Sequence, residues 1–275
     1  MNCQVIINTQ SGRADRLDVK KILERHTNFD DQITVSYLRN VEDWTDNCHK
    51  VIVCGGDGTL YSALNKYAIK PDTHLVYVAC GTLNENACFK KNLTDVGLVN
   101  DKLVFSYVMA TGVFTSIGYD CTTEDKQKHK KLAYWKKALL SYEITPQDIC
   151  VATPHWTWHK PTALMMLLRS DRCFGFRFNK MYKDNTTYIL LVSAKGPLKT
   201  TTLPKLFRCF FMGFDKPYFT EDIVFAPIDS ATLNVPSNTE FCIDGEKVSF
   251  GNNTTVKISS KHLYNAVTID YGCLH

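Results

Sequence analysis

Residues 51–60 read Val-Ile-Val-Cys-Gly-Gly-Asp-Gly-Thr-Leu, and this stretch decides the fold of the chain around it. Four apolar residues typical of a buried strand run directly into a glycine-rich turn, and a helix-like segment over 61–67 follows. Because glycine permits close approach of the backbone, such a strand–turn–helix unit can point several N–H groups at one anion. The pattern indicates a phosphate site, although a tight turn with a purely structural role gives the same local signal.

The composition of this turn limits the kinds of phosphate site it can form. Neither a GxGxxG nor a GxxxxGK[ST] pattern is present, so the turn is not a dinucleotide-binding or Walker loop. Asp57 would repel a phosphate unless a divalent cation lay between them, which indicates a kinase-type magnesium–nucleotide site.

Strand and helix patterns alternate through the first hundred residues. Apolar runs of strand type cover 3–8, 33–38, 51–54 and 75–79, and helical spacing covers 17–25. This alternation predicts a parallel α/β sheet, in which ligands gather beyond the carboxyl ends of the strands. We therefore expect the turns at 8–12, 55–59 and 80–85 to converge.

From about residue 149 the pattern changes to short β-rich runs separated by turns, with one helical piece over 203–212. The runs fall at 162–169, 187–194, 223–228, 231–235, 239–243 and 255–259 and predict an antiparallel sandwich or barrel. The predicted fold is an α/β N-terminal nucleotide-binding domain and a mainly antiparallel β-sandwich C-terminal domain. The predicted domains are 1–115, 116–262, and a C-terminal segment, 263–275, that returns to the first domain.

Bulk composition describes an ordinary globular protein with 44% hydrophobic and 22% charged residues. No apolar run is long enough to span a bilayer and the N-terminus has no signal-peptide pattern, so we expect a cytoplasmic protein. The 11 cysteines form no CxxC pair and are expected to be reduced and structural.

Charge is unevenly distributed along the chain. Residues 1–120 carry 12 Lys/Arg and 14 Asp/Glu, a net charge of −2, and residues 121–275 carry 20 and 14, a net charge of +6. The segment 126–137 (KQKHKKLAYWKK) interleaves lysines with aromatics, a pattern that suits an anionic membrane surface and equally a solvated helix. We expect peripheral membrane association and no nucleic-acid partner, and a homodimer stays open.

Five motifs, taken together and in order, resemble the diacylglycerol-kinase-like lipid kinases, which are related to sphingosine kinases and NAD kinases. The motifs are Asn8-x-x-Ser11-Gly12, Gly55-Gly56-Asp57-Gly58-Thr59, Gly81-Thr82-x-Asn84-Glu85, Gly118-Tyr119-Asp120 and Asp244-Gly245-Glu246. Three residues depart from the family pattern: Thr9 and Ala79 replace prolines, and Glu85 replaces an aspartate.

The resemblance implies transfer of the ATP γ-phosphoryl group to a lipid hydroxyl, most naturally that of diacylglycerol, with ATP and Mg²⁺ as cofactors. It implies catalytic roles for Asp244, Glu246 and Asp57, with Asp244 taking the hydroxyl proton, and metal ligation by Asp57, Glu85 and Asp120. The implied nucleotide-binding residues are Asn8, Ser11, Gly12, Gly55, Gly56, Gly58, Thr59, Gly81, Thr82 and Asn84.

Two other functions stay open. An NAD kinase shares the Gly-Gly-Asp-Gly-Thr motif, although the first and last motifs belong to the lipid branch. A nucleotide-binding protein without kinase activity is the second, because of the three departures and a short 170–200 segment. An Asp-Gly pair such as Asp244-Gly245 is also common in structural β-turns.

Overall fold

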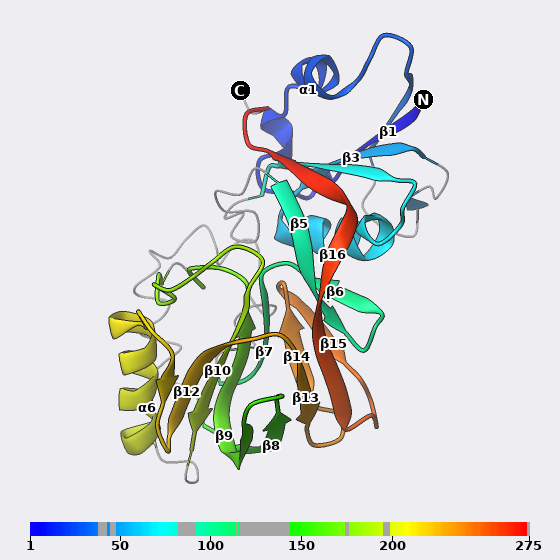
Figure 1. Ribbon diagram of the computed structural model, residues 1–275. Helices are drawn as coiled ribbons and strands as arrows, with labels where there is room; N and C mark the ends of the chain where they lie inside the picture. Colours follow the sequence, from blue (N-terminus) through cyan, green and yellow to red (C-terminus); the bar gives the residue numbers. More distant parts are fainter. Residues whose placement is uncertain are drawn as a thin grey trace. The chain divides into compact units, whose positions relative to one another are not determined.

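The computed structural model describes residues 1–37, 43–44, 48–81, 92–113, 115, 144–173, 176–194 and 199–273. The chain divides into two compact units (Figure 1). The first unit contains residues 1–96, 103–106 and 261–275, and the second contains residues 97–102 and 107–260. Neither unit is a single continuous segment of the chain.

The first unit is built on a parallel sheet. Its strands pair in the order β2, β1, β3, β4 and the end of β16, and every pair is parallel. Their bounds are β1 (Asn2–Ile7), β2 (Gln32–Tyr37), β3 (Lys50–Gly55), β4 (His74–Ala79) and β16 (Thr255–Asp270). The chain passes from β1 to β2 on one side and then to β3 on the other, so the strand order reverses between β1 and β3. In open α/β sheets this reversal is where ligands bind.

Helices cover both faces of the parallel sheet. A short 3₁₀ turn, η1 (Ala14–Arg16), precedes α1 (Val19–His26), and Ile22 of α1 packs with Cys3, Val5 and Ile7 of β1. Helix α2 (Asp57–Ala63) continues as a π-helical segment, η3 (Leu64–Ala68), and these contact β3 and β4. Consecutive residues of β1 and β3 are buried. Since successive side chains of a strand point to opposite faces, both faces of these strands are covered.

The second unit is a mainly antiparallel β-structure in which β9 is shared by two groups of strands. The first half of β9 pairs with β8 and its second half with β7, while β10 pairs along the other edge. One group continues through β10 to β12 and β11 and through β7 to β14 and β15, and the other runs from β8 to β13 and the start of β16. The bounds are β7 (Val108–Gly112), β8 (Gln147–Ala152), β9 (Thr157–Leu168), β10 (Thr187–Ser193), β11 (Tyr218–Phe219), β12 (Ile223–Ile228), β13 (Ala231–Asn234), β14 (Glu240–Ile243) and β15 (Glu246–Ser249).

One helical segment packs on the sheet of the second unit, beside β10 and β12 (Figure 1). It consists of α6 (Lys199–Phe207) and a π-helical turn, η4 (Arg208–Met212). Phe210 of η4 contacts Phe178 edge to face, and Phe225 of β12 stacks on Phe214 at 4.3 Å between ring centroids. These aromatic contacts form the core beneath the helix.

The predicted fold class is confirmed, with an α/β first unit and a mainly antiparallel β second unit. Each β-rich run expected after residue 149 is a strand, and the predicted helical piece coincides with α6 and η4. The compact units differ from the predicted domain ranges, 1–115, 116–262 and 263–275, at 97–102 and from residue 107 onward, because both stretches belong to the second unit. Residues 108–112 pair there as β7. The alternating pattern of residues 103–114 also predicts strands, and β6 (Leu103–Phe105) and β7 lie there. Strand β5 (Asn92–Val99), which pairs with β6 and β16, was not predicted.

The cysteines in the described part of the chain are free thiols, and most of them are buried. Burial raises the pKa of Cys3 to about 11 and that of Cys209 to about 12, so these thiols are protonated at neutral pH. For these residues the expectation of reduced, structural cysteines agrees with the structure. No helix in the described ranges is long and apolar enough to cross a membrane.

Candidate nucleotide site and the Asp-Gly hairpin

Three turns of the first unit meet at the carboxyl ends of β1, β3 and β4. The Asn8 N–H donates to the Cys54 carbonyl at 3.0 Å, and the Cys80 N–H donates to the Gly55 carbonyl at 2.9 Å. These bonds join the turn after β3 to the turns after its two neighbours. The convergence predicted from the sequence is therefore present for residues 8–12, 55–59 and 80–81.

The glycine-rich turn is tight because its backbone touches neighbouring groups. A Cβ on Gly55 would lie 2.3 Å from the Thr59 side chain, closer than any real contact, and a Cβ on Gly56 would lie 3.3 Å from the Gly81 Cα. Gly56 is the N-cap of α2, and Asp57 is its first residue. The first N–H groups of any helix have no acceptor within the helix, so those of Gly58 and Thr59 are available to an anion at this edge.

The first turn is held by its own predicted site residues. The Asn8 Oδ1 accepts from the Gln10 N–H at 3.0 Å, and its Nδ2 donates to the Thr59 hydroxyl at 2.9 Å. The Ser11 Oγ accepts from the Gly56 N–H at 3.1 Å. Asn8 and Ser11 thus fix the geometry of the glycine-rich turn, whatever further contacts they make with a ligand. Gly12 lies exposed in the same loop.

Arg13, which is not among the predicted site residues, binds the backbone of the third turn. Its Nε and Nη2 both donate to the Gly81 carbonyl, at 2.9 and 2.7 Å, and its own N–H donates to the Cys80 carbonyl. The guanidinium therefore places a positive charge beside the site. The only sequence signal was its position directly after Ser11-Gly12 in the motif.

Two side chains next to the three turns, Tyr77 and Cys80, are fully buried. Burial, with the nearby charge of Asp57 as a further cause, raises the pKa of Tyr77 well above its ordinary value, and the Tyr77 hydroxyl donates to the Gly55 carbonyl at 2.9 Å. Burial also raises the pKa of Cys80 to about 11. Neither group is an acid or base at neutral pH, and both serve to support the turn.

The Asp-Gly pair of the last motif forms the two-residue turn of the β14–β15 hairpin. Ile243 pairs with Glu246, and both turn residues have positive φ, 49° for Asp244 and 95° for Gly245. Positive φ at both central positions is the type I′ pattern, which Asp-Gly and Asn-Gly favour. The structural reading of this pair as a β-turn is therefore correct as far as the backbone is concerned.

The Asp244 carboxylate is buried and tied to the backbone of the second unit. Only 1% of the residue is exposed, and its Oδ1 accepts from the N–H groups of Tyr107 and Val108, both at 2.9 Å. The Asp244 N–H in turn donates to the Val108 carbonyl. A structural turn at a hairpin tip needs no buried carboxylate, so the placement of this side chain distinguishes Asp244 from an ordinary turn residue.

The two carboxylates of the hairpin have different environments. Glu246, the first residue of β15, is exposed, whereas Asp244 is buried. The preceding Cys242 is buried as well, and burial raises its pKa to about 11. The catalytic roles of Asp244 and Glu246 stay predictions, as does that of Asp57.

Several predicted site residues cannot be placed. Thr82, Asn84, Glu85 and Asp120 lie outside the described residues, as does the basic segment 126–137. Of the three predicted metal ligands, Asp57 alone has a described position. The predicted nucleotide-binding residues that are described, from Asn8 to Gly81, all belong to the three converging turns.

Comparison with known proteins agrees with this geometry. The family model of the diacylglycerol kinase catalytic domain matches residues 2–99. A search among curated proteins finds no match.

Solved structures share the fold at low sequence identity. A diacylglycerol kinase from Bacillus anthracis str. Sterne has a TM-score of 0.63 at 15% identity, covering 98% of this chain and 97% of that chain. An NAD kinase from Archaeoglobus fulgidus in complex with ATP has a TM-score of 0.51 at 10% identity, covering 98% and 93%. The match over residues 2–99 and the shared fold confirm the resemblance to the diacylglycerol-kinase-like family, with NAD kinases as relatives, that the motifs predicted.

Proposed function

We propose that this protein is an ATP-dependent lipid kinase that transfers the γ-phosphoryl group to a lipid hydroxyl, with diacylglycerol as the acceptor. The observation that carries the proposal is the convergence of the three turns at the point where the strand order of the parallel sheet reverses. The diacylglycerol kinase match over residues 2–99 supports a kinase-type catalytic domain there.

In this proposal the first unit binds the nucleotide. The contact distance of 3.3 Å from a Gly56 Cβ to Gly81 means that a side chain would fill the space where two turns meet. Backbone N–H groups of Gly58 and Thr59 would face the phosphates, and Arg13 would add positive charge beside them. A divalent cation held by Asp57 would neutralise charge on the phosphates. ATP binding by the related NAD kinase supports the choice of nucleotide.

The second unit supplies the group that accepts the proton. Two backbone N–H groups hold Oδ1 of Asp244 in place, and the carboxylate so held would take the proton of the lipid hydroxyl. A fixed carboxylate has no rotamer freedom left to lose when the acceptor binds, which suits a general base. Glu246 would assist from its exposed position.

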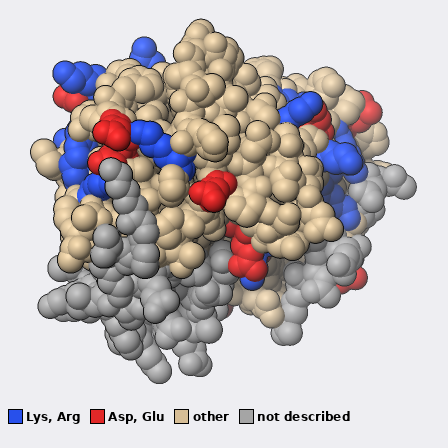
Figure 2. Space-filling model, turned by 90° about the horizontal axis from the view of Figure 1, so that it is seen from below, with Lys and Arg blue, Asp and Glu red and all other residues tan. Residues whose placement is uncertain are grey.

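A lipid acceptor implies work at a membrane surface, and we include peripheral association in the proposal. On the face seen in Figure 2, described basic and acidic side chains lie interspersed among wide uncharged areas. That face has no large patch of basic side chains among its described residues, so the net charge of +6 on residues 121–275 is the support for association.

The first experiment measures ATP binding by calorimetry in the presence of Mg²⁺ for the wild-type protein and Gly56→Val. The backbone of Gly56 is extended, with φ −93° and ψ −168°, which valine adopts readily. We therefore expect a folded variant that has lost ATP binding. Asp244→Asn is the matched control and should bind ATP normally. Unchanged ATP affinity in folded Gly56→Val would contradict the placement of the nucleotide.

The second experiment measures transfer of radiolabelled phosphate from ATP to a panel of diacylglycerol, other lipid alcohols and NAD. Labelling of diacylglycerol is expected. Labelling of NAD alone would replace the proposal with an NAD kinase. ATP binding without transfer to any acceptor would identify a nucleotide-binding protein without kinase activity.

A further inference from the structure

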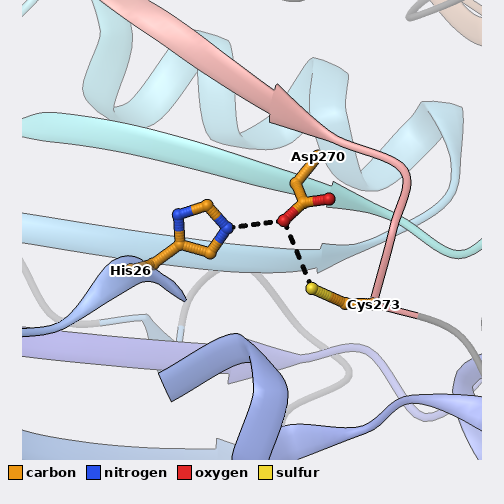
Figure 3. A group of neighbouring side chains, drawn as sticks. All are labelled: His26, Asp270 and Cys273. Atoms are coloured by element: carbon orange, nitrogen blue, oxygen red, sulfur yellow. Dashed lines mark hydrogen bonds and ion pairs between the residues drawn. The ribbon is translucent and has the colours of Figure 1, made fainter. Parts of the chain in front are cut away.

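A second cluster of reactive side chains lies in the first unit, apart from the three turns. It consists of His26, the last residue of α1, Asp270, the last residue of β16, and Cys273 (Figure 3). The His26 Nε2 lies 2.7 Å from the Asp270 Oδ2, and the Cys273 Sγ lies 3.2 Å from the same oxygen. One donor atom from each residue lies within 4.8 Å of the other two. Segments almost 250 residues apart in sequence thus bring three ligand-type atoms to one point.

The donor set suits one class of metal ion. An imidazole nitrogen, a thiolate sulfur and a carboxylate oxygen together are typical ligands of Zn²⁺, whereas Mg²⁺ and Ca²⁺ prefer oxygen alone. Ligand atoms 2.0–2.3 Å from a tetrahedral ion lie roughly 3–4 Å apart. The Asp270–Cys273 distance is already in this range, and the His26–Asp270 pair needs to open by about half an ångström.

Backbone contacts hold the cluster in place independently of the bonds among its three side chains. Asp270 pairs with Val78 in the parallel sheet, and the Asp18 N–H donates to the Cys273 carbonyl at 3.0 Å. Cys273 is fully buried in the same apolar cluster as Ile22 of α1. The ligands are therefore placed by the sheet, the helix and the C-terminal turn before any ion binds.

Arg25 is the group that competes with a metal ion. Its Nη1 lies 3.2 Å from both carboxylate oxygens of Asp270 and 3.9 Å from the Cys273 Sγ. The side chain is 44% exposed, so it can withdraw into solvent or remain on Oδ1 as an outer contact. Without metal, the Asp270 carboxylate accepts from Arg25, from the Cys273 thiol and from the Gly272 N–H at 2.6 Å, and it pairs with His26 Nε2.

We propose that His26, Asp270 and Cys273 form a Zn²⁺ site with three protein ligands and a fourth position for water. On binding, the Cys273 thiol proton leaves to solvent, and any proton on His26 Nε2 leaves to solvent or is replaced by one on Nδ1, so that the neutral ring coordinates through Nε2. The ion would tie the end of β16 to α1 and so stabilise the first unit. The site does not involve the proposed kinase residues, and its test is independent of kinase activity.

The test is a metal titration of the metal-free full-length protein. We expect about one equivalent of Zn²⁺ by calorimetry, and with Co²⁺ as a probe a thiolate-to-cobalt charge-transfer band in the near ultraviolet. Cys273→Ser and His26→Gln should each weaken Zn²⁺ binding at least about 10-fold, by comparison with the effect of lesser changes around metal sites. Cys150→Ser and His262→Gln are matched controls, because Cys150 is half-buried in β8 and the exposed His262 pairs with Asp95. Both should bind as the wild type does.

The Arg25→Gln variant distinguishes a Zn²⁺ site from a cluster that only holds α1 and the end of β16 together by hydrogen bonds. If the cluster binds Zn²⁺, removing the competing charge should tighten binding several-fold and increase the rise in thermal midpoint that Zn²⁺ causes. If the cluster is only hydrogen-bonded, Arg25→Gln lowers the thermal midpoint, and Zn²⁺ does not change that midpoint. Absence of the charge-transfer band in the wild type, or Zn²⁺ binding that ignores both Cys273→Ser and Arg25→Gln, would overturn the proposal even if one ligand variant failed to fold.

Discussion

The dipeptide Asp-Gly follows a buried strand in each unit, and the two copies have different structures. Asp57-Gly58 opens α2 after β3 and its Gly-Gly turn, and Gly58 is helical. Asp244-Gly245 joins β14 to β15 with both residues at positive φ. The same two residues therefore start a helix in a parallel sheet and close a hairpin in an antiparallel one.

The residues on either side decide between these outcomes. After Gly58 the chain buries Thr59, Leu60 and Ala63 at helical spacing against the sheet. After Gly245 the chain turns back at once, and residues 246–249 pair with β14. Apolar residues three and four positions apart favour a helix. A strand that turns back after two residues favours a type I′ turn.

The comparison also concerns what each aspartate does. Asp57 lies at the strand end where three turns meet, whereas Asp244 is buried with its carboxylate on two backbone N–H groups. We infer that Asp57 acts on the nucleotide and Asp244 on the acceptor. Three experiments compare the two dipeptides and their surroundings, in order of decreasing effect.

The largest expected effect is on turnover. Asp244→Asn keeps an oxygen for the Tyr107 and Val108 N–H groups and tolerates positive φ, so the fold should persist. Loss of the base should lower kcat by roughly 10²–10⁴-fold with ATP binding unchanged. Asp57→Asn should instead weaken binding of the magnesium–nucleotide. Calorimetry and steady-state kinetics on both variants check this, and near-normal turnover of Asp244→Asn would leave Asp244 as a turn residue.

The second effect is on stability at alkaline pH, and it measures the burial of the Cys242 thiol in the hairpin. Burial raises the pKa of Cys242 from 9.0 to about 11, so the unfolded chain ionises first as the pH rises. The contribution of this thiol to stability is intact below pH 9 and is lost between about pH 9 and 11. In Cys242→Ser the fall in unfolding free energy over this range should be smaller by roughly 2 kcal/mol. Denaturant unfolding at several pH values measures it, and equal slopes in the wild type and Cys242→Ser would contradict the raised pKa of Cys242.

The smallest effect has opposite signs in the two dipeptides. Gly245→Ala places a Cβ at φ 95° and should destabilise the protein by about 1–2 kcal/mol. Gly58→Ala replaces a helical glycine and should stabilise it by about 0.4–1 kcal/mol. Thermal unfolding of the two variants compares them. A loss of stability in Gly58→Ala would mean that the Gly-rich turn is too crowded at this point for a side chain.

The sequence predicted the first unit well because its signals are local. The apolar runs at 3–8, 51–54 and 75–79 correspond to β1, β3 and β4, and the glycines between them mark the turns. The parallel order of these strands then follows from the alternation with helices. The role of Arg13 could not be predicted, because its bonds to Gly81 depend on a contact 68 residues away.

The second unit was predicted in content and less well in pairing. A strand was expected at 255–259, followed by a separate C-terminal segment, 263–275, but β16 runs without interruption from Thr255 to Asp270. The polar stretch Ser259-Ser260-Lys261-His262 hides this continuity, because a strand that changes partners along its length needs no apolar residues where it is exposed. The burial of Asp244 was equally hidden, since its partners are backbone N–H groups that no residue type encodes.

The course of β16 has a consequence for the order in which the molecule can be built during synthesis. Within β16, residues up to Ser260 belong to the second unit and those from Lys261 onward to the first. Four of the five described parallel strands of the first unit have been synthesised by residue 79, and the fifth is synthesised only after the second unit. The parallel sheet of the first unit therefore cannot be completed, and β4 lacks its β16 partner, until more than half of the chain has been translated after β4. The Asp-Gly hairpin, by contrast, forms from neighbouring residues as soon as it is made.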